Sequence, residues 1–299
     1  MEFFEFMFGH MAEFDFKMVI MWIIGGTLIF LAIKKEMEPT LLLPMGFGAI
    51  MVNLPLSGAI DQIITESEGP LSTLYKLGIS NELFPLILFI GIGAMIDLGP
   101  LLSNPKLMIF GAAAQFGIFF TLCVASLMFA PNDAASIAII GAADGPTAIV
   151  VAQKLNSQYL GAIMVAAYSY MALVPIIQPP IIKALTTKKE RMIRMPYQPK
   201  SVSKLTRILF PIIITAVAGI VAPSSVALIG FLMFGNLMRE CGVLDSLSET
   251  AQKVLANLIT IFLGITIASQ MQADQFLKKE TLLIMGLGLV PFIFDTAGG

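Results

Sequence analysis

The stretch IAIIGAADGPTAIVVAQ, residues 137–153, is apolar at both ends and carries Asp144 followed by a Gly-Pro pair at its centre. Proline lacks the amide hydrogen that a helix needs, and its ring clashes with the preceding turn. A carboxylate at bilayer depth is expensive and normally faces the protein interior or a water-filled cavity. We therefore interpret the stretch as two half-helices that meet at a polar break, an arrangement that holds ions near the membrane midplane in transporters.

Asp144 is the residue that we predict to bind a cation or a proton at this break. The small residues around it would let backbone carbonyls approach an ion, and hard cations prefer oxygen ligands. The residues alone do not decide which of the two it binds. The alternative is an ordinary loop between two short helices, in which Asp144 only caps the second helix.

The composition is that of a membrane protein. Hydrophobic residues make up 57% of the 299 residues and charged residues 13%, about half of the ~25% that is usual in soluble domains. We predict an all-α polytopic membrane protein with about nine to ten membrane segments, including broken, re-entrant half-helices, in two inverted repeats. The net charge of −2 argues against a nucleic-acid partner, and two cysteines with one histidine exclude a Cys/His zinc site and a disulfide framework.

The pattern of apolar runs and charges divides the chain into four parts. Residues 1–82 hold N-terminal membrane segments and an extracytoplasmic connection, and residues 83–185 form the first repeat, with the broken helix at 137–153. Residues 186–207 are strongly basic, and the positive-inside rule places this loop in the cytoplasm. Residues 208–299 form a second repeat that is incomplete at its C-terminus, because the chain stops in apolar sequence; we expect the protein to continue.

Both ends of the broken segment are predicted to lie on the same side of the membrane. If the span at 159–185 ends in the cytoplasm, it begins outside. The span before the broken segment begins at Lys106, whose weak charge bias places that end in the cytoplasm, so this span ends outside. Asn132 and Asn156 then lie on one side, which fits a re-entrant pair of half-helices and not a full span.

The acidic N-terminus argues against a cleavable signal peptide. Residues 2–17 would either lie in the membrane interface or form a disordered lead-in.

A weak internal similarity suggests where a partner for Asp144 might come from. GIGAMIDLGPLLSNPK, a span and AIIGAADGP match in order LMFGNLMRECGVLDSLSE, a span and LIMGLGLVPFIFDTAGG, and paired interrupted segments are typical of transporters. Chance similarity among glycine-rich helices is the alternative. On this pattern we predict that Asn236 and Asp295 lie at helix breaks that face Asp144 and contribute to the metal site. Asp97 is predicted to cap or turn a helix end, and Tyr168 to be a packing aromatic.

The motif IGAADGPTAIVVAQKL resembles the signature of the beta subunits of biotin-dependent, sodium-pumping decarboxylases, which act on oxaloacetate, methylmalonyl-CoA, glutaconyl-CoA or malonate. Further segments resemble the same family in the same order, so that the resemblance extends from Leu83 to Gly299. They are IGIGAMIDLGPLLSNPK, AAYSYMALVPIIQPPIIKALTTKKER, MFGNLMRECGVLDSLSETAQ, ITIFLGITIASQM and FDTAGG.

The resemblance implies a membrane subunit that decarboxylates carboxybiotin carried on a partner and couples this step to Na+ export with proton consumption. It implies that Asp144 binds Na+ or the counter-moving proton and that Tyr170 belongs to the same pathway, so both are candidate catalytic residues. The family's later Asn, Ser and Arg site residues would follow Gly299. Implied partners are a biotin carrier/carboxyltransferase subunit, a small membrane gamma or delta subunit, the lipid bilayer and further copies of the chain. The implied location is the cytoplasmic (inner) membrane of a bacterium or archaeon.

Two other functions fit the residues alone. A secondary Na+-coupled carboxylate transporter or Na+/H+ antiporter would use the same broken-helix site, and a non-catalytic membrane scaffold for a soluble enzyme would need no site. The sequence contains no biotin-attachment lysine motif and no carboxyltransferase-like domain, so biotin would have to arrive on another chain. That absence is expected for the decarboxylase pump and is neutral for the carrier.

Overall fold

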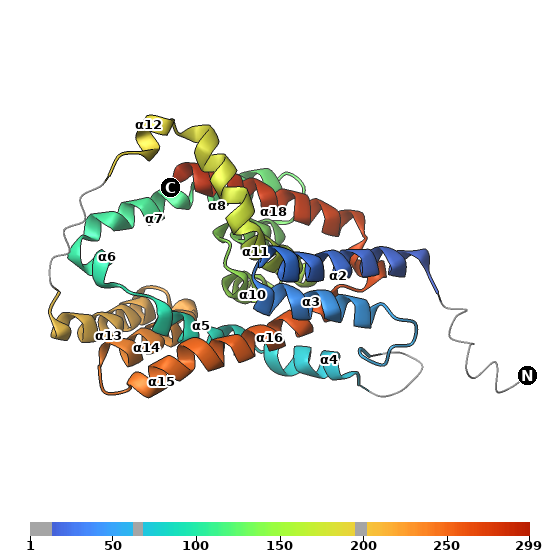
Figure 1. Ribbon diagram of the computed structural model, residues 1–299, viewed down its shortest axis with the longest axis horizontal. Helices are drawn as coiled ribbons and strands as arrows, with labels where there is room; N and C mark the ends of the chain where they lie inside the picture. The colour runs from blue at the N-terminus through green and yellow to red at the C-terminus, as the bar shows by residue number, and fades with distance from the viewer. Residues whose placement is uncertain (1–13, 62–67, 195–201) are drawn as a thin grey trace, which may run out of the picture.

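The computed structural model describes residues 14–61, 68–194 and 202–299, and all regular elements in these ranges are helical, which confirms the predicted all-α class (Figure 1). The interfacial helix or lead-in predicted for residues 2–17 lies mostly outside the described residues. In chain order the elements are α2 (Phe16–Lys35), α3 (Pro39–Val52), α4 (Pro70–Leu74), the π turn η2 (Tyr75–Ile79), α5 (Leu83–Met95), α6 (Gly99–Ser103), the 3₁₀ turn η3 (Pro105–Leu107), α7 (Met108–Ala114), α8 (Phe116–Ala125), α9 (Pro131–Ala138), the 3₁₀ turn η4 (Ile139–Ala142), α10 (Gly145–Lys154), α11 (Leu160–Leu185), α12 (Lys188–Arg191), α13 (Lys204–Val221), the 3₁₀ turn η5 (Pro223–Ser225), α14 (Val226–Glu240), α15 (Asp245–Thr250), the π turn η6 (Ala251–Leu255), α16 (Ala256–Ile267), the 3₁₀ turn η7 (Ala268–Gln270), α17 (Ala273–Phe276) and α18 (Lys279–Gly298).

Six helical segments in the described part of the chain are long and apolar enough to cross a membrane, which confirms a polytopic protein. A seventh span would be the bent pair Pro70–Ile79 and Leu83–Met95, whose halves meet at 62°. The predicted nine to ten segments are not confirmed. The helices α3 and α14 have 14 and 15 residues, and at ~1.5 Å per residue they fall short of a ~30 Å hydrocarbon core. The helix α5 is shorter still, with 13 residues that end at Met95. The six spans are Phe16–Lys35, Pro105–Ala125, Leu160–Leu185, Lys204–Val221, Asp245–Gln270 and Lys279–Gly298.

Local sequence explains several helix ends. The side chain of Asp15 accepts a hydrogen bond from the N–H of Lys17 and so caps the start of α2, which ends at Lys34 and Lys35. Basic residues in a last turn complement the negative end of the helix dipole. Asp97 accepts a hydrogen bond from the N–H of Gly99 at 2.9 Å, where the chain turns from α5 into α6. This confirms the prediction that Asp97 turns a helix end.

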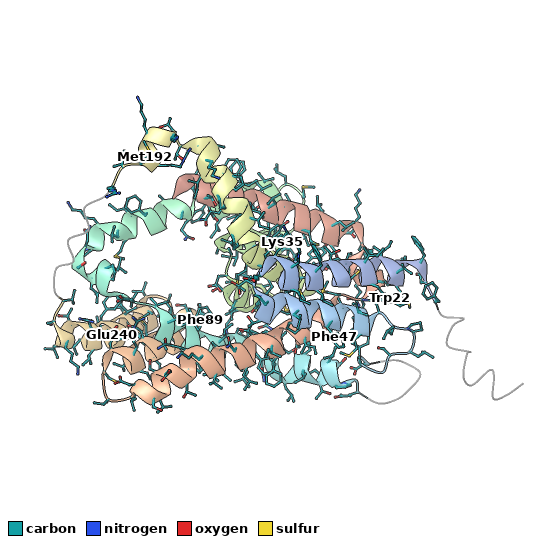
Figure 2. The ribbon with its side chains drawn as sticks, viewed as in Figure 1. Trp22, Lys35, Phe47, Phe89, Met192 and Glu240 are labelled. Carbon is teal, nitrogen blue, oxygen red and sulfur yellow. The ribbon has the colours of Figure 1, made fainter. Side chains whose placement is uncertain are left out.

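One buried cluster joins α2, α3, α11 and α16, and Figure 1 shows α2 and α3 side by side. The buried side chain of Asn53 closes one end of it, because its amide donates to Met271 O and its oxygen accepts from Ala273 N, both at 2.7 Å. Trp22, labelled in Figure 2, donates to Asn53 O at 3.1 Å. These bonds tie the end of α3 to the turn before α17. A second buried cluster surrounds residues 137–153, where α8, α11 and α18 pack against the broken segment.

The helices α5 and α14 cross at two glycines with reciprocal contacts. A Cβ on Gly93 would overlap Leu232 O, and a Cβ on Gly235 would overlap Ile90 O. Each glycine thus contacts the carbonyl of the residue three positions before the other glycine. Small residues at such a crossing let two helix backbones approach closely. Reciprocal contacts are what a two-fold relation between equivalent elements produces. This crossing supports part of the predicted repeat, and the inverted arrangement stays a prediction.

Candidate functional site

The segment 137–153 is broken where the sequence predicts. The first half-helix is α9 with η4, which ends at Ala142, and the second is α10, which begins at Gly145. Ala143 between them has φ 51° and ψ 35°, the left-handed conformation that a residue with a side chain seldom adopts. Asp144 is extended, with φ −122° and ψ 93°. The chain therefore turns sharply at Ala143 and presents Asp144 between the end of one helix and the start of the next.

Asp144 caps α10, as the alternative interpretation of an ordinary loop predicts, and this cap lies at the break itself. One carboxylate oxygen accepts the N–H of Thr147 at 3.3 Å, and the other accepts the hydroxyl of Thr147 at 2.6 Å. The α10 N-terminus stabilises a negative charge there. The C-terminal end of η4 faces the same point, and half-helix C-terminal carbonyls are typical cation ligands in transporters. Capping and cation binding are thus compatible in this geometry.

The two ends of the broken segment are joined by a polar clasp, which we define as Asn132, Asp133, Asn156, Ser157 and Gln158. The amide of Asn132 donates to Leu155 O at 3.3 Å and to Asn156 O at 3.5 Å. Asp133 accepts the hydroxyl of Ser157 at 2.7 Å and the N–H of Gln158 at 3.0 Å. The segment therefore begins and ends at one place, as a hairpin does. Its re-entrant course in the membrane stays a prediction.

Two tyrosines of α11 contact different parts of the site. Tyr168 is fully buried, and a Cβ on Gly145 would lie 2.6 Å from its ring, so the ring covers the residue next to Asp144. Tyr170 faces α18 instead: its hydroxyl donates to Met285 O and its ring lies against Gly288. The structure thus places Tyr168, for which sequence reasoning predicted an interfacial or packing role, against Gly145, whereas the predicted pathway residue Tyr170 contacts α18.

Asp295 lies beside the break of segment 137–153, but its own helix is not broken. The prediction that it occupies a second interruption is wrong, because α18 is continuous from Lys279 to Gly298. One Asp295 oxygen accepts the N–H of Ile118 at 3.1 Å. The other oxygen lies 2.8 Å from the position that a Cβ on Gly141 would occupy. Asp295 therefore contacts the first half-helix, three residues before Asp144, and has no hydrogen bond to Asp144 among the described residues.

Asn236 has no hydrogen bond to Asp144 among the described residues, and the prediction that it lies at a helix break is wrong, because α14 is continuous. Its side chain is 1% exposed and donates to Gly93 O at 3.4 Å and to Ile96 O at 2.9 Å. Beside it, Arg239 donates to Met95 O at 2.6 Å. These bonds satisfy the last carbonyls of α5, which a helix C-terminus leaves without partners. The contacts of Asn236 explain its burial without a metal ion.

Sequence reasoning missed Thr147 and Asp133. Thr147 is three residues after Asp144, the position whose N–H a capping side chain reaches, and this spacing is a usable signal. Asp133, 2% exposed, follows Pro131 at the start of α9. Its partners are 24 and 25 residues away, so only the folded hairpin identifies it. Within the described residues there is no group of three or more His, Cys, Asp or Glu side chains that could hold a metal ion. A cation at Asp144 would take its other ligands from hydroxyls and carbonyls.

Comparisons with known proteins found a matching family model and several similar proteins. A family model described as the Na+-transporting oxaloacetate decarboxylase beta subunit matches residues 17–299. The chain is 48% identical, over 301 residues, to methylmalonyl-CoA decarboxylase subunit beta of Propionigenium modestum, with 94% of this chain and 76% of that protein covered. It is 42% identical, over 337 residues, to the oxaloacetate decarboxylase beta chain of Klebsiella pneumoniae, with 94% and 78% covered. It is 48% identical to methylmalonyl-CoA decarboxylase subunit beta of Veillonella parvula, with 94% and 73% covered.

Proposed function

The chain belongs to the family of Na+-transporting oxaloacetate decarboxylase beta subunits, and on that premise we propose that Asp144 is the residue at which transported Na+ and a proton exchange. Membership makes the chain a membrane subunit of a decarboxylase sodium pump. The observation that carries the assignment to Asp144 is the break itself, where a carboxylate stands between two half-helix ends in a clasped hairpin.

The proposed reaction joins carboxybiotin decarboxylation to this exchange. Carboxybiotin, carried on a partner subunit, loses CO2 when its carboxylated nitrogen takes up one proton, so each turnover consumes a proton. We propose that Asp144 binds Na+ when ionised and releases it when a proton arrives. Moving one charge against 100 mV costs ~2.3 kcal/mol, which the decarboxylation must supply for each net charge exported.

The neighbours of Asp144 have distinct roles in this proposal. Thr147 donates its backbone N–H to one carboxylate oxygen of Asp144 and its hydroxyl to the other, and so orients both oxygens toward the η4 end. Tyr168 covers Gly145 and excludes water from that side. Tyr170 fixes α18 against α11 through Met285 O, which keeps Asp295 beside Gly141. Tyr170 is therefore a positioning residue for the pathway.

We further propose a setting for this subunit. It would work in the cytoplasmic membrane with a biotin carrier/carboxyltransferase subunit, a small membrane subunit and other copies of itself. The choice of acid would belong to the carboxyltransferase, because the relatives named for oxaloacetate and for methylmalonyl-CoA match the chain over the same share of its length. The basic loop beginning after α11 would face the cytoplasm, where carboxybiotin is presented.

The test is the exchange of Asp144 for asparagine in the assembled complex. Asp144→Asn keeps an oxygen that accepts the Thr147 N–H but removes the charge, so Na+-stimulated decarboxylation and ²²Na+ transport into proteoliposomes should both fall to background. Asp97→Asn is the matched control, because Asp97 is exposed and, among the described residues, its side chain bonds only to Gly99 N. Full Na+-stimulated turnover in Asp144→Asn would remove this carboxylate from the mechanism.

A further inference from the structure

A cavity of ≈ 700 Å³ lies between the break, the C-terminal part of α11 and the last turns of α18. Figure 1 shows these last turns beside α7 and α8, at the end of the molecule from which α12 projects. The cavity is lined at the break by Gly141, Ala142 and Ala143, and at its other end by Thr186, the residue that follows α11. It therefore connects the start of the basic loop with the backbone that immediately precedes Asp144.

Asp295 is the carboxylate in the wall of this cavity, and its two oxygens have different surroundings. Oδ1 accepts the N–H of Ile118 in the first turn of α8, where the chain has kinked at Gln115 and left backbone donors free. Oδ2 is buried and has no hydrogen-bond partner among the described residues. A buried carboxylate oxygen without a donor is costly unless a proton or a cation occupies it.

Two glycines leave the room for this carboxylate. A Cβ on Gly117 would overlap Asp295 Oδ1, and a Cβ on Gly141 would lie 2.8 Å from Oδ2. Any larger residue at either position would displace the side chain. The free oxygen thus points at the backbone of η4, whose last carbonyls face the same region as Asp144, and carbonyl oxygens are suitable ligands for Na+.

We propose that Asp295 is an intermediate Na+ site, which receives the ion from the cavity and passes it to Asp144 across the η4 backbone. This inference rests on the proposed function, because it takes Asp144 as the main site and the α11 end as the cytoplasmic side. The ion enters past Thr186, binds Oδ2 of Asp295 together with backbone carbonyls, and then moves along the break. Ile118 holds Oδ1 throughout, so the carboxylate keeps its orientation when the ion leaves.

The first test measures the Na+ dependence of decarboxylation by the assembled complex with Asp295→Asn and Asp295→Glu. Asn retains an oxygen that accepts the Ile118 N–H but has no charge, so the Na+ concentration for half-maximal rate should rise at least tenfold. Glu keeps the charge and should recover part of that shift. Asp97→Asn, away from the cavity, should match the unsubstituted complex. A half-saturating Na+ concentration in Asp295→Asn equal to that of the unsubstituted complex would overturn the proposal.

The second test does not depend on turnover, and its comparison of Na+ with K+ needs no Asp295 variant. Ala142 lines the cavity and is exposed, so Ala142→Cys, in a background without Cys123 and Cys241, should react with a membrane-impermeant thiol reagent from the side of the basic loop. Na+ should slow the reaction and K+ should not, and Asp295→Asn should remove the protection. Equal rates in Na+ and K+ would overturn the proposal. Failure of Asp144 as the main site would show separately, as Na+-stimulated turnover in Asp144→Asn.

Discussion

At the scale of the residue, Asp144 has a structural role in the same place as the chemical role that we propose for it. It caps α10 through Thr147, and the cap holds a negative charge at the start of a helix, where the dipole favours it. The left-handed Ala143 turns the chain so that this cap coincides with the end of the preceding half-helix. The carboxylate therefore stands at the meeting point of two half-helix ends.

Thr147 provides the prediction at this scale. Thr147→Val removes the hydroxyl that donates to Asp144 at 2.6 Å. A hydrogen bond to a charged group is worth about 1.5–3 kcal/mol, so the Na+ concentration for half-maximal decarboxylation should rise about tenfold or more. Thr147→Ser should restore it. Thr215→Val is the control, because that hydroxyl bonds only within α13, to Pro211 O. An unchanged Na+ dependence in Thr147→Val would contradict an orienting role for Thr147.

At the scale of the element, the broken segment behaves as one hairpin because its ends are clasped. Asp133 brings together the first turn of α9 and the residues before α11, and its oxygen satisfies a hydroxyl and a backbone N–H. Asp133 itself is buried, and a hydrogen bond to a charged group is worth about 1.5–3 kcal/mol. The clasp therefore sets the position of the break relative to α11, whose tyrosines contact the hairpin and α18.

Cross-linking tests the clasp directly. With Cys123 and Cys241 replaced, the pair Asn132→Cys and Asn156→Cys should be joined by a short bifunctional thiol reagent, because the side chain of Asn132 reaches Asn156 O at 3.5 Å. Asp133→Ala should slow this cross-linking, since it frees the two ends from each other. The pair Asn132→Cys and Lys189→Cys is the control and should not react. Rapid cross-linking of the control pair would contradict the hairpin geometry.

The crossing of α5 and α14 supports a prediction about stability. Gly235→Ala would place a methyl group against Ile90 O, so the two helices must separate, and overpacking of this kind costs about 1–3 kcal/mol. The thermal unfolding midpoint in detergent should fall. Gly26→Ala is the matched control, because a Cβ there meets nothing within 4 Å and alanine is better than glycine within a helix by about 0.5–1 kcal/mol. If Gly235→Ala were as stable as Gly26→Ala, the close crossing would be wrong.

At the scale of the whole molecule, contacts between distant segments bring element ends together. Lys154 at the end of α10 pairs with Glu82 at 3.5 Å, and Gln153 donates to Ile79 O at 2.6 Å, so the hairpin base lies beside the start of α5. Lys17 pairs with Asp274 at 2.8 Å, which brings the start of α2 to α17. The basic residues of α12 follow the C-terminal end of α11, and Figure 2 labels Met192 directly after α12 there.

This arrangement predicts the result of labelling from the two sides of the membrane. Single cysteines at Asn81 and Asn156 should react with an impermeant reagent on one face. Asn81 is next to Glu82 and Asn156 is two residues after Lys154, and the ion pair of Glu82 with Lys154 brings these two positions to the same end of the molecule. A cysteine at Lys189 should react on the other face, as the positive-inside rule expects. Right-side-out and inverted vesicles would distinguish the faces. Labelling of Asn156 and Lys189 from the same face would contradict the re-entrant topology.

The sequence by itself determined the features that depend on local chemistry. Composition decided the membrane class, Gly145 and Pro146 decided that the helix breaks beside Asp144, and Asp97 decided a helix turn. These follow from helix geometry, the missing amide hydrogen of proline and the expense of a buried carboxylate, all of which act within a few residues. Three prolines in α11 did not break that helix, as the predicted continuous span requires.

Only the tertiary structure decided which distant groups meet the break. Asp295 reached it from a continuous helix, because Gly117 and Gly141 leave room for its carboxylate, and Asn236 was directed to the end of α5 instead. The glycine and aspartate that suggested a second interruption in α18 do not break it, since a helix packed on both sides retains its hydrogen bonds through such residues. Pairing across 24 to 177 residues, as for Asp133 and Asp295, depends on how helices pack, and no local pattern encodes it.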